Sequence, residues 1–427
     1  MKTTTLPPGR RIRAGRRVYY GWIIVAATLA ITVVSCGTLL SWGVFVIPLA
    51  SEFGWTRGEL SGVASVSALA YAASIPLVGV LADKHGFRMA IAASAGVLGL
   101  SWVLSSQARS LWELYLFSGV LAGIGTGAAF SMPLSVVSQW FRKRRGIALG
   151  IASCGISIGG AAGPPFVSFL ILQFGWRAAF AAMGALVILV CVPVAVAALR
   201  RPDEGYVEAH EGVGFGAAVG VEAADDVSFS LRDAMATPAF WYLFAALALS
   251  IVVEGVTVVH LVPYAQDRGL SALDAAALMT AVGLFGLVGR PTLGAISDRV
   301  GAKPVLAACL VAEGVMMVWL SGAGLPWMLY AFCAVWGVAN SGILMLVSKL
   351  TAQLFGSRSM GAVFGGISVG DGIGFAIGPV LAGYLYDVTG TYNVAFLLVA
   401  AAAIVAAMLT ASLRQPRKAQ REASACG

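Results

Sequence analysis

The chain has 427 residues, of which 59% are hydrophobic and 11% are charged. A soluble domain carries roughly 25% charged residues, so this composition excludes an ordinary soluble protein. The formal net charge is +8, but no aromatic-interleaved RNA- or DNA-binding motif accompanies the basic residues, and we expect no nucleic-acid partner.

Twelve largely apolar segments follow one another along the chain, each with a stretch long enough to approach or cross the roughly 30 Å hydrocarbon core of a bilayer. Backbone polar groups in lipid must find their hydrogen-bond partners within their own segment, which favours helices over open sheet. The sequence therefore predicts an all-α membrane protein with 12 transmembrane helices. The segments lie near residues 19–48, 57–82, 89–108, 111–140, 146–172, 177–199, 238–265, 272–297, 304–322, 326–348, 359–386 and 392–413.

The positively charged residues are divided unequally between the two sides of these segments. Of 28 Lys and Arg residues, four lie at one set of segment ends and loops, Arg290 lies within a span, and the others lie on the opposite side. Cytoplasmic loops carry the excess of Lys and Arg, so both termini are predicted to be cytoplasmic in a multi-pass plasma (inner) membrane protein whose basic face contacts anionic lipid. The four residues predicted to be outside are Arg57, Arg109, Arg177 and Arg268.

The cysteines show no pattern typical of a metal or cofactor site. There are six, and five of them sit in apolar spans without the spacing of metal ligands. They are interpreted as small core residues. We therefore expect neither a metal nor a cofactor.

A constant offset of 215 residues relates many positions of the first half of the chain to the second. "GVLADKHG" from Gly79 recurs as "GAISDRVG" from Gly294, and "GP" at 163–164 recurs at 378–379. Because both halves start on the same side, they are predicted to be related by an axis along the membrane normal and to enclose a central cavity. A short helix is expected near Leu231, in the linker. The predicted parts are an N-terminal cytoplasmic tail 1–18, a six-helix half 19–199, a cytoplasmic linker 200–237, a second six-helix half 238–413 and a C-terminal cytoplasmic tail 414–427.

The two motif copies also carry a family resemblance. "GVLADKHGFR" and "GAISDRVGAK" resemble the signature that follows helices two and eight of the major facilitator superfamily, and the resemblance covers almost the whole chain. Independently, Asp83 and Asp298 end their helices where a carboxylate can meet the positive N-terminus of a neighbouring helix, and Arg88 can pair with it. Such contacts would latch one conformation and break in the other, whereas the alternative is a solvated loop charge. The predicted latch residues are Gly79, Asp83, Arg88, Gly294, Asp298 and Arg299.

A narrower resemblance follows helix four. "WFRKRRGIALGIASCGISIGG" resembles the start of helix five in the monocarboxylate transporters and their oxalate/formate antiporter-like relatives. The resemblance implies that Arg290, followed by Pro291 in helix eight, binds the substrate carboxylate. The chain departs from these relatives at Gly286, where the animal transporters have an aspartate, and at Asp371, the best match to a lysine of the oxalate-type exchangers. One cation without a second clamp favours a monocarboxylate over a dicarboxylate, and the missing aspartate leaves a coupled proton to Asp371, Glu254 or the substrate.

Four ionisable residues lie well inside the predicted spans, all in the second half. A charge at a helix centre costs at least about 2.5–3.5 kcal/mol on insertion scales, so such residues are functional candidates by default. Arg290 lies eight residues before Asp298, about 12 Å from the cytoplasmic helix end, near the midplane where transporters bind substrates. Its planar guanidinium can hold a carboxylate through two parallel hydrogen bonds, and the alternative is a structural ion pair. The four residues are Glu254, Arg290, Glu313 and Asp371.

The internal carboxylates are given different roles. Asp371 in helix eleven and Glu254 in helix seven are candidates for proton coupling or for a resting ion pair with Arg290, and helix packing is the alternative. Glu313 is excluded from the candidate site because helix nine lies on the outside of the fold that the sequence resembles.

Three uncharged residues complete the candidate pocket. Tyr71 lies one turn from Ile75, the first-half counterpart of Arg290, and can offer its hydroxyl to the same carboxylate. Asn340 is polar at mid-depth in helix ten, and Phe130 of helix four can form an apolar wall. Packing is the alternative for each. The predicted substrate-binding residues are Arg290, Tyr71, Asn340 and Phe130.

These features favour a secondary transporter that moves a small organic monocarboxylate by alternating access, with or without a coupled proton. The alternatives are a carboxylate exchanger and a drug or metabolite efflux antiporter, because "GGAAGPP" at 159–165 resembles part of the antiporter signature. No paired catalytic carboxylates, nucleophile elbow or phosphate loop is found, so an enzyme is not expected. The expected partners are a small organic anion, protons and the lipid bilayer, and the protein is expected to act as a monomer.

Overall fold

The computed structural model describes residues 19–141, 144–200, 229–356 and 360–414. Within them all regular elements are helices, and eleven helical stretches are long and apolar enough to cross a membrane. The longest stretch, Gly146–Ala198, is interrupted at Gly175, whose φ of 80° and ψ of 165° are not helical. When this stretch is counted as two segments, the eleven become the predicted twelve, and the all-α membrane fold is confirmed.

The predicted N-terminal tail, all but the first residue of the predicted C-terminal tail and most of the predicted linker fall outside the described residues. The described end of the linker contains the helix α11 (Leu231–Met235), which confirms the short helix expected near Leu231. Ser230 caps this helix, because its side chain accepts a hydrogen bond from the backbone N–H of Asp233.

Local chemistry sets several helix ends in the first half of the chain. Gly54 ends α2 with a φ of 71°, a backbone conformation that suits glycine. Thr56 and Glu59 then form a reciprocal capping box that starts α3. The elements are α1 (Tyr20–Leu39), α2 (Trp42–Phe53), α3 (Arg57–His85), α4 (Phe87–Ser105), α5 (Leu111–Leu114), the π-helical η1 (Tyr115–Leu121), α6 (Ala122–Ser131), α7 (Pro133–Trp140), α8 (Arg145–Leu186), the π-helical η2 (Val187–Cys191) and α9 (Val192–Ala198).

The second half repeats this plan with longer uninterrupted helices. Ser271 caps its second long helix by accepting a hydrogen bond from the N–H of Asp274. Proline occupies the first turn of two helices, at Pro238 and Pro326, where a missing N–H costs no hydrogen bond. The elements after α11 are α12 (Pro238–Asp267), α13 (Ala272–Val300), α14 (Ala302–Ser321), α15 (Pro326–Phe355), α16 (Met360–Thr389) and α17 (Asn393–Ala411).

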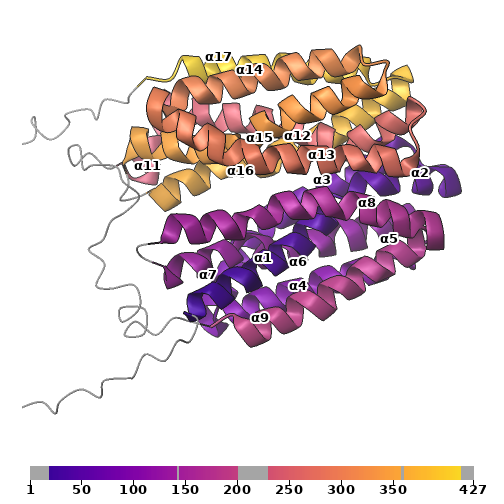
Figure 1. Ribbon diagram of the computed structural model, residues 1–427, viewed down its shortest axis with the longest axis horizontal. Helices are drawn as coiled ribbons and strands as arrows, with labels where there is room; N and C mark the ends of the chain where they lie inside the picture. Colours follow the sequence, from indigo (N-terminus) through magenta and orange to yellow (C-terminus); the bar gives the residue numbers. More distant parts are fainter. Residues whose placement is uncertain (1–18, 142–143, 201–228, 357–359, 415–427) are drawn as a thin grey trace, which may run out of the picture.

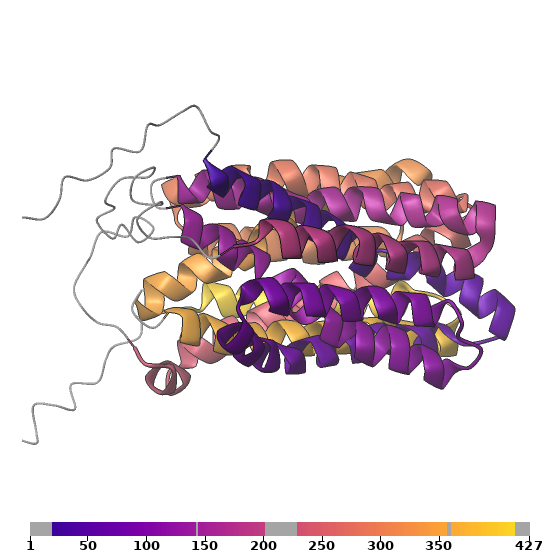
Figure 2. The same cartoon turned by 90° about the horizontal axis from the view of Figure 1, so that it is seen from below.

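The two groups of helices form two bundles that lie side by side. Figure 1 shows the violet and magenta helices α1 to α9 in one bundle and the orange and yellow helices α11 to α17 in the other. Figure 2 shows from a perpendicular direction that the long helices of both bundles run along the same axis. Helix α1 begins and α17 ends at one end of the molecule. Because α3 ends there, we call it the Asp83 end, and we call the opposite end, where α3 begins, the Arg57 end.

The bundles meet where α3 contacts α16 and where α8 contacts α13. Small residues let the backbones approach closely. A Cβ added at Gly383 of α16 would lie 2.8 Å from the carbonyl oxygen of Arg57, and one added at Gly283 of α13 would lie 2.6 Å from that of Ser157. The interface therefore depends on glycine at these positions.

Burial decreases from the Arg57 end to the Asp83 end. On α3, all residues from Leu60 to Ser65 are buried, whereas beyond Tyr71 the buried residues are Ser74, Val78 and Ala82. On α13, Ser297 is the one buried residue beyond Arg290. The bundles are thus packed together at the Arg57 end and part toward the Asp83 end.

We expect Gly283→Ala to destabilise the protein, because the new methyl group would overlap backbone atoms of α8. Overpacking of this kind costs about 1–3 kcal/mol, which thermal unfolding of the purified protein in detergent would register as a lower apparent Tm. Gly150→Ala is the matched control, because its Cβ would meet nothing within 4 Å. An equal Tm for the two variants would contradict the close approach of α8 and α13.

Candidate functional site

A cavity of about 260 Å³ lies between the two bundles, with walls from α1, α2, α3, α4, η1, α6 and α8 on one side and α12, α13, α15 and α16 on the other. All six side chains that the sequence proposes for binding and proton coupling line it, and each is partly buried. These residues are Tyr71, Phe130, Glu254, Arg290, Asn340 and Asp371. The cavity therefore brings together residues that are up to 300 positions apart in the sequence.

Arg290 lies on the wall of this cavity and reaches across to the other bundle. Its Nη1 donates a hydrogen bond of 3.0 Å to the carbonyl oxygen of Ser153 on α8. The backbone around it is placed by glycine, since a Cβ at Gly289 would lie 2.8 Å from the Cα of Val338 on α15. Within the described part of the chain, no carboxylate lies within ion-pair distance of Arg290. A guanidinium has five N–H donors, so this one retains donors for an anion in the cavity.

Two carboxylates face the same cavity from α12 and α16. Glu254 lies close enough to Arg290 and to Asp371 to interact with both electrostatically. Asp371 interacts in the same way with Tyr71 from the opposite bundle. The second half thus contributes one cation and two acids to the cavity, and the first half contributes none of either.

Aromatic side chains of the first bundle line the same cavity as Arg290. The rings of Tyr71 and Phe130 meet edge to face, with centroids 6.2 Å apart and an interplanar angle of 75°. Trp42 and Trp102 line the cavity as well. A cavity with an apolar wall and a cation suits a ligand with a carboxylate at one end and a small apolar group at the other.

Glu313, which was left out of the candidate site, lies behind the cavity wall, inside the second bundle, and is bonded to residues of that wall. It is fully buried on α14. Ser250 donates a hydrogen bond of 2.9 Å to its Oε2, and Asn340 Nδ2 donates one of 3.3 Å to its Oε1. Both donors also line the cavity. Because the Asn340 amide already donates to Glu313, it is less free to bind substrate than its mid-depth position in helix ten suggested.

The predicted latch residues lie at the Asp83 end, away from the cavity. Asp83, Arg88 and Arg299 are exposed, and in the described residues no hydrogen bond or ion pair joins Asp83 or Arg88 to another residue. Asp298 forms an ion pair with Lys349 of α15, in its own bundle. Gly79 and Gly294 are partly buried, and a Cβ at Gly79 would meet nothing within 4 Å. Within the described residues, the latch residues form no ion pair or hydrogen bond from one bundle to the other. The bundles are parted at this end.

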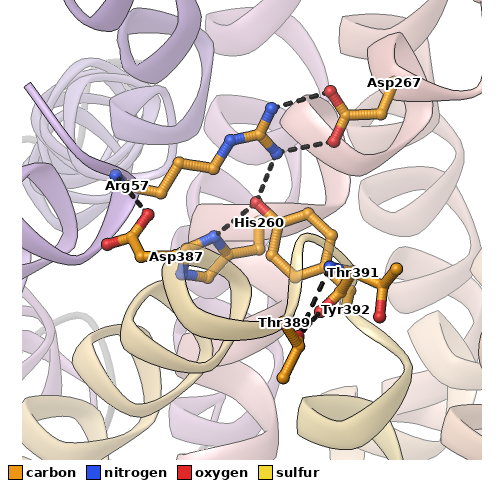
Figure 3. Close-up of polar contacts among 7 residues, drawn as sticks. All are labelled: Arg57, His260, Asp267, Asp387, Thr389, Thr391 and Tyr392. Atoms are coloured by element: carbon orange, nitrogen blue, oxygen red, sulfur yellow. Dashed lines mark hydrogen bonds and ion pairs between the residues drawn. The ribbon is translucent and has the colours of Figure 1, made fainter. Parts of the chain in front are cut away.

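A second polar cluster, at the Arg57 end, was not found from the sequence. Figure 3 shows Arg57 of α3 reaching across to Asp267 of α12 and to Tyr392, with His260 and Asp387 beside them. One signal for it was available: the 215-residue offset matches Asp267 with Glu52 and Tyr392 with Arg177. In the first bundle Arg177 binds Glu52 at 2.6 Å. In the second bundle Tyr392 stands at the position that corresponds to Arg177. Asp267 therefore pairs with Arg57 of the first bundle.

Comparison with known proteins gives the family of the chain. A sequence model of the Major Facilitator Superfamily matches residues 27–304 and 256–425. Monocarboxylate transporter 13 of Bos taurus is 28% identical over 389 residues, which cover 90% of this chain and 86% of that protein. Monocarboxylate transporter 12 of Mus musculus is 26% identical, with 94% of this chain and 87% of that protein covered.

Solved structures share the fold at low sequence identity. A bacterial homologue of the human lysosomal transporter Spinster, in an inward-facing and occupied conformation, matches with a TM-score of 0.68 and 18% identity over 93% of this chain and 96% of that one. Its unoccupied inward-facing form matches with a TM-score of 0.67. The relatives are transporters and not enzymes. The chain belongs to the major facilitator superfamily of membrane transporters, in its monocarboxylate-transporter-like branch.

Proposed function

We propose that the protein moves a small organic monocarboxylate across the membrane by alternating access, with Arg290 as the carboxylate-binding residue. The observation that carries this proposal is a guanidinium on the wall of the cavity between the bundles, bonded to one backbone carbonyl of the opposite bundle and to no described carboxylate. The relatives named as monocarboxylate transporters support the same substrate class.

The substrate carboxylate replaces the carbonyl of Ser153 as the partner of Arg290. A carboxylate accepts two parallel hydrogen bonds from a guanidinium, which are stronger than bonds between neutral groups. The single cation sets the number of carboxylates at one, and the ring pair Tyr71–Phe130 accommodates the organic part. Neutralising Arg290 lowers the cost of enclosing it in a low-dielectric cavity, so the bundles can close around the bound anion.

Asp371 and Glu254 hold the coupled proton. Both line the cavity that contains Arg290, and a carboxylate substrate that enters beside them raises the local negative charge. A proton on either acid compensates for that charge. Substrate and proton then cross together, which is symport.

The Asp83 end is the cytoplasmic end, because the loops there carry the excess of Lys and Arg. The bundles part at that end, so this conformation opens inward. In the outward-open conformation the bundles approach one another there, and Asp83, Arg88, Asp298 and Arg299 form the latch that the sequence predicts. In that conformation the Asp83 carboxylate exchanges its contact with water for a contact with Arg88 or with the N-terminus of a neighbouring helix.

Replacing Arg290 with methionine should weaken transport of every accepted carboxylate. Hydrogen bonds to charged groups contribute about 1.5–3 kcal/mol, so uptake at subsaturating substrate should fall roughly 10- to 100-fold. Uptake of a labelled carboxylate panel into proteoliposomes measures this, with Arg177→Gln as the control, since Arg177 is an arginine outside the cavity. Undiminished uptake by Arg290→Met would refute the site, and selective transport of organic cations would favour drug efflux.

Asp371→Asn and Glu254→Gln should separate proton coupling from substrate exchange. The variant that removes the coupling acid should keep counterflow of labelled substrate between the two sides but lose accumulation driven by a pH gradient. Glu313→Gln is the matched control, because that acid is buried behind the wall and does not line the cavity. Full gradient-driven accumulation by both variants and by the double variant would exclude these acids, and a wild type that shows counterflow without any response to a pH gradient would identify an exchanger.

A further inference from the structure

His260 on α12 is a buried titratable residue that the proposed transport site does not use. It is fully buried and lies in the cluster at the Arg57 end, beside Tyr392 and Arg57 (Figure 3). Its Nε2 lies 2.9 Å from the carbonyl oxygen of Pro379 and 3.1 Å from Ser61 Oγ, and its Nδ1 lies 3.1 Å from the hydroxyl of Tyr392. Both ring nitrogens therefore have partners, drawn from both bundles.

The partners of Nε2 require that this nitrogen carry a hydrogen. The carbonyl of Pro379 can only accept. Ser61 Oγ donates its own hydrogen to the carbonyl of Arg57 at 2.6 Å, so toward His260 it also acts as an acceptor. Nε2–H is therefore the donor to both oxygens.

The partner of Nδ1 requires that this nitrogen be an acceptor. Tyr392 accepts a hydrogen bond of 2.7 Å from Arg57 Nη1, which directs its own hydrogen away from the guanidinium. That hydrogen is available to Nδ1. These hydrogen bonds assign the neutral Nε2–H tautomer to His260. Arg57 donates to the Tyr392 hydroxyl, and that hydroxyl donates to Nδ1 of His260.

The same cluster holds the two bundles together at this end. Arg57 Nη1 and Nη2 donate to the two carboxylate oxygens of Asp267 at 2.6 and 2.7 Å. Asp387 of α16 accepts from the backbone N–H groups of Arg57 and Gly58 at 3.0 and 2.7 Å, so it caps the N-terminus of α3 from the opposite bundle. The guanidinium also lies 3.9 Å from the ring centre of Tyr386.

A proton added to Nδ1 conflicts with this arrangement. The nitrogen would become a donor that faces the Tyr392 hydroxyl, which already accepts from Arg57. It would also add a second positive charge near the guanidinium, at a fully buried position where bulk solvent screens charges weakly.

The nearby acids do not offset that charge, because each is already engaged. Asp267 is paired with Arg57, and Asp387 is bound to two backbone N–H groups. Farther along the packed elements, Glu52 of α2 binds Arg177 and Trp176, and Asp274 of α13 bonds Ser271. The ionisable and phenolic groups that interact with His260 are Arg57, Asp387 and Tyr392. Around them, Asp267 pairs with Arg57, Tyr386 lies against Arg57 and Tyr392, and Tyr264 lies against Tyr392.

We propose that Nδ1 of His260 is a proton-binding site that is empty while the Arg57 end is closed and filled when that end opens. A proton that arrives from this side then favours the open conformation, and closure expels it. This proposal rests on the alternating access described above, but not on the identity of the substrate or on the role of Arg290.

The test measures the opening of the Arg57 end in the absence of substrate. Spin labels are attached at Gln107→Cys and Gly324→Cys, two exposed loop positions at the Arg57 end, one in each bundle. The background is the full chain with its six native cysteines replaced by alanine, reconstituted in lipid nanodiscs. The distance between the two spin labels, measured by double electron–electron resonance from pH 8 to pH 5, should become longer as the pH falls.

His260→Gln should abolish this shift and leave the short distance at every pH, because glutamine keeps a donor and an acceptor but binds no proton. His85→Gln is the matched control, since His85 is an exposed histidine at the Asp83 end, and it should retain the shift. A wild type without a shift, or a shift that persists in His260→Gln, would overturn the proposal.

Tyr392→Phe keeps the proposal testable if His260→Gln folds poorly. The neutral, closed form loses the hydrogen bond to Nδ1, so opening should begin at a higher pH than in the wild type. An unchanged midpoint, or one at lower pH, would contradict the assigned tautomer. Arg290→Met should keep the wild-type pH response while losing uptake, so a failure of the transport site and a failure of the proton site give different results.

Discussion

An arginine inside an apolar bundle must be solvated by something, and the structure supplies only part of what Arg290 needs. Its position in α13 leaves the guanidinium at the cavity with one hydrogen bond, to the Ser153 carbonyl of the opposite bundle. Enclosing an ionised group without a counter-charge is costly. In the proposed function, the substrate carboxylate forms the direct ion pair that Arg290 does not form with the nearby Glu254 and Asp371 in the described residues. Closure of the cavity, proton compensation by neighbouring acids and the preference for one carboxylate all depend on that requirement.

The two ends of the molecule apply the same chemistry in opposite ways. At the Arg57 end, the carboxylate of Asp387 caps α3 from the other bundle, and Arg57 pairs with Asp267. At the Asp83 end, the carboxylates that end α3 and α13 are exposed, and Asp298 pairs within its own bundle. A carboxylate at a helix N-terminus is a modest interaction when it is near water, so contacts of this kind can form and break as the bundles rock.

Much of the architecture follows from the sequence, because long apolar segments in lipid have few structural solutions. The twelve segments, the superfamily and the helix near Leu231 were predicted correctly. Arg290, Glu254 and Asp371 could be chosen because a charge at mid-depth is costly, and all three line the cavity. Arg57 and Asp387 lie at helix ends, where charge is ordinary, so their pairing across the bundles left no comparable trace. The partners of Glu313 depend on which way α14 faces, which an evenly apolar helix does not reveal.

The most direct test of the central claim is a structure of the protein with a transported monocarboxylate bound, determined in a lipid nanodisc. We expect density for the carboxylate within hydrogen-bond distance of the Arg290 guanidinium, with the organic group against Tyr71 and Phe130 and the bond to Ser153 broken. A ligand bound elsewhere, with Arg290 still donating to the Ser153 carbonyl, would contradict it.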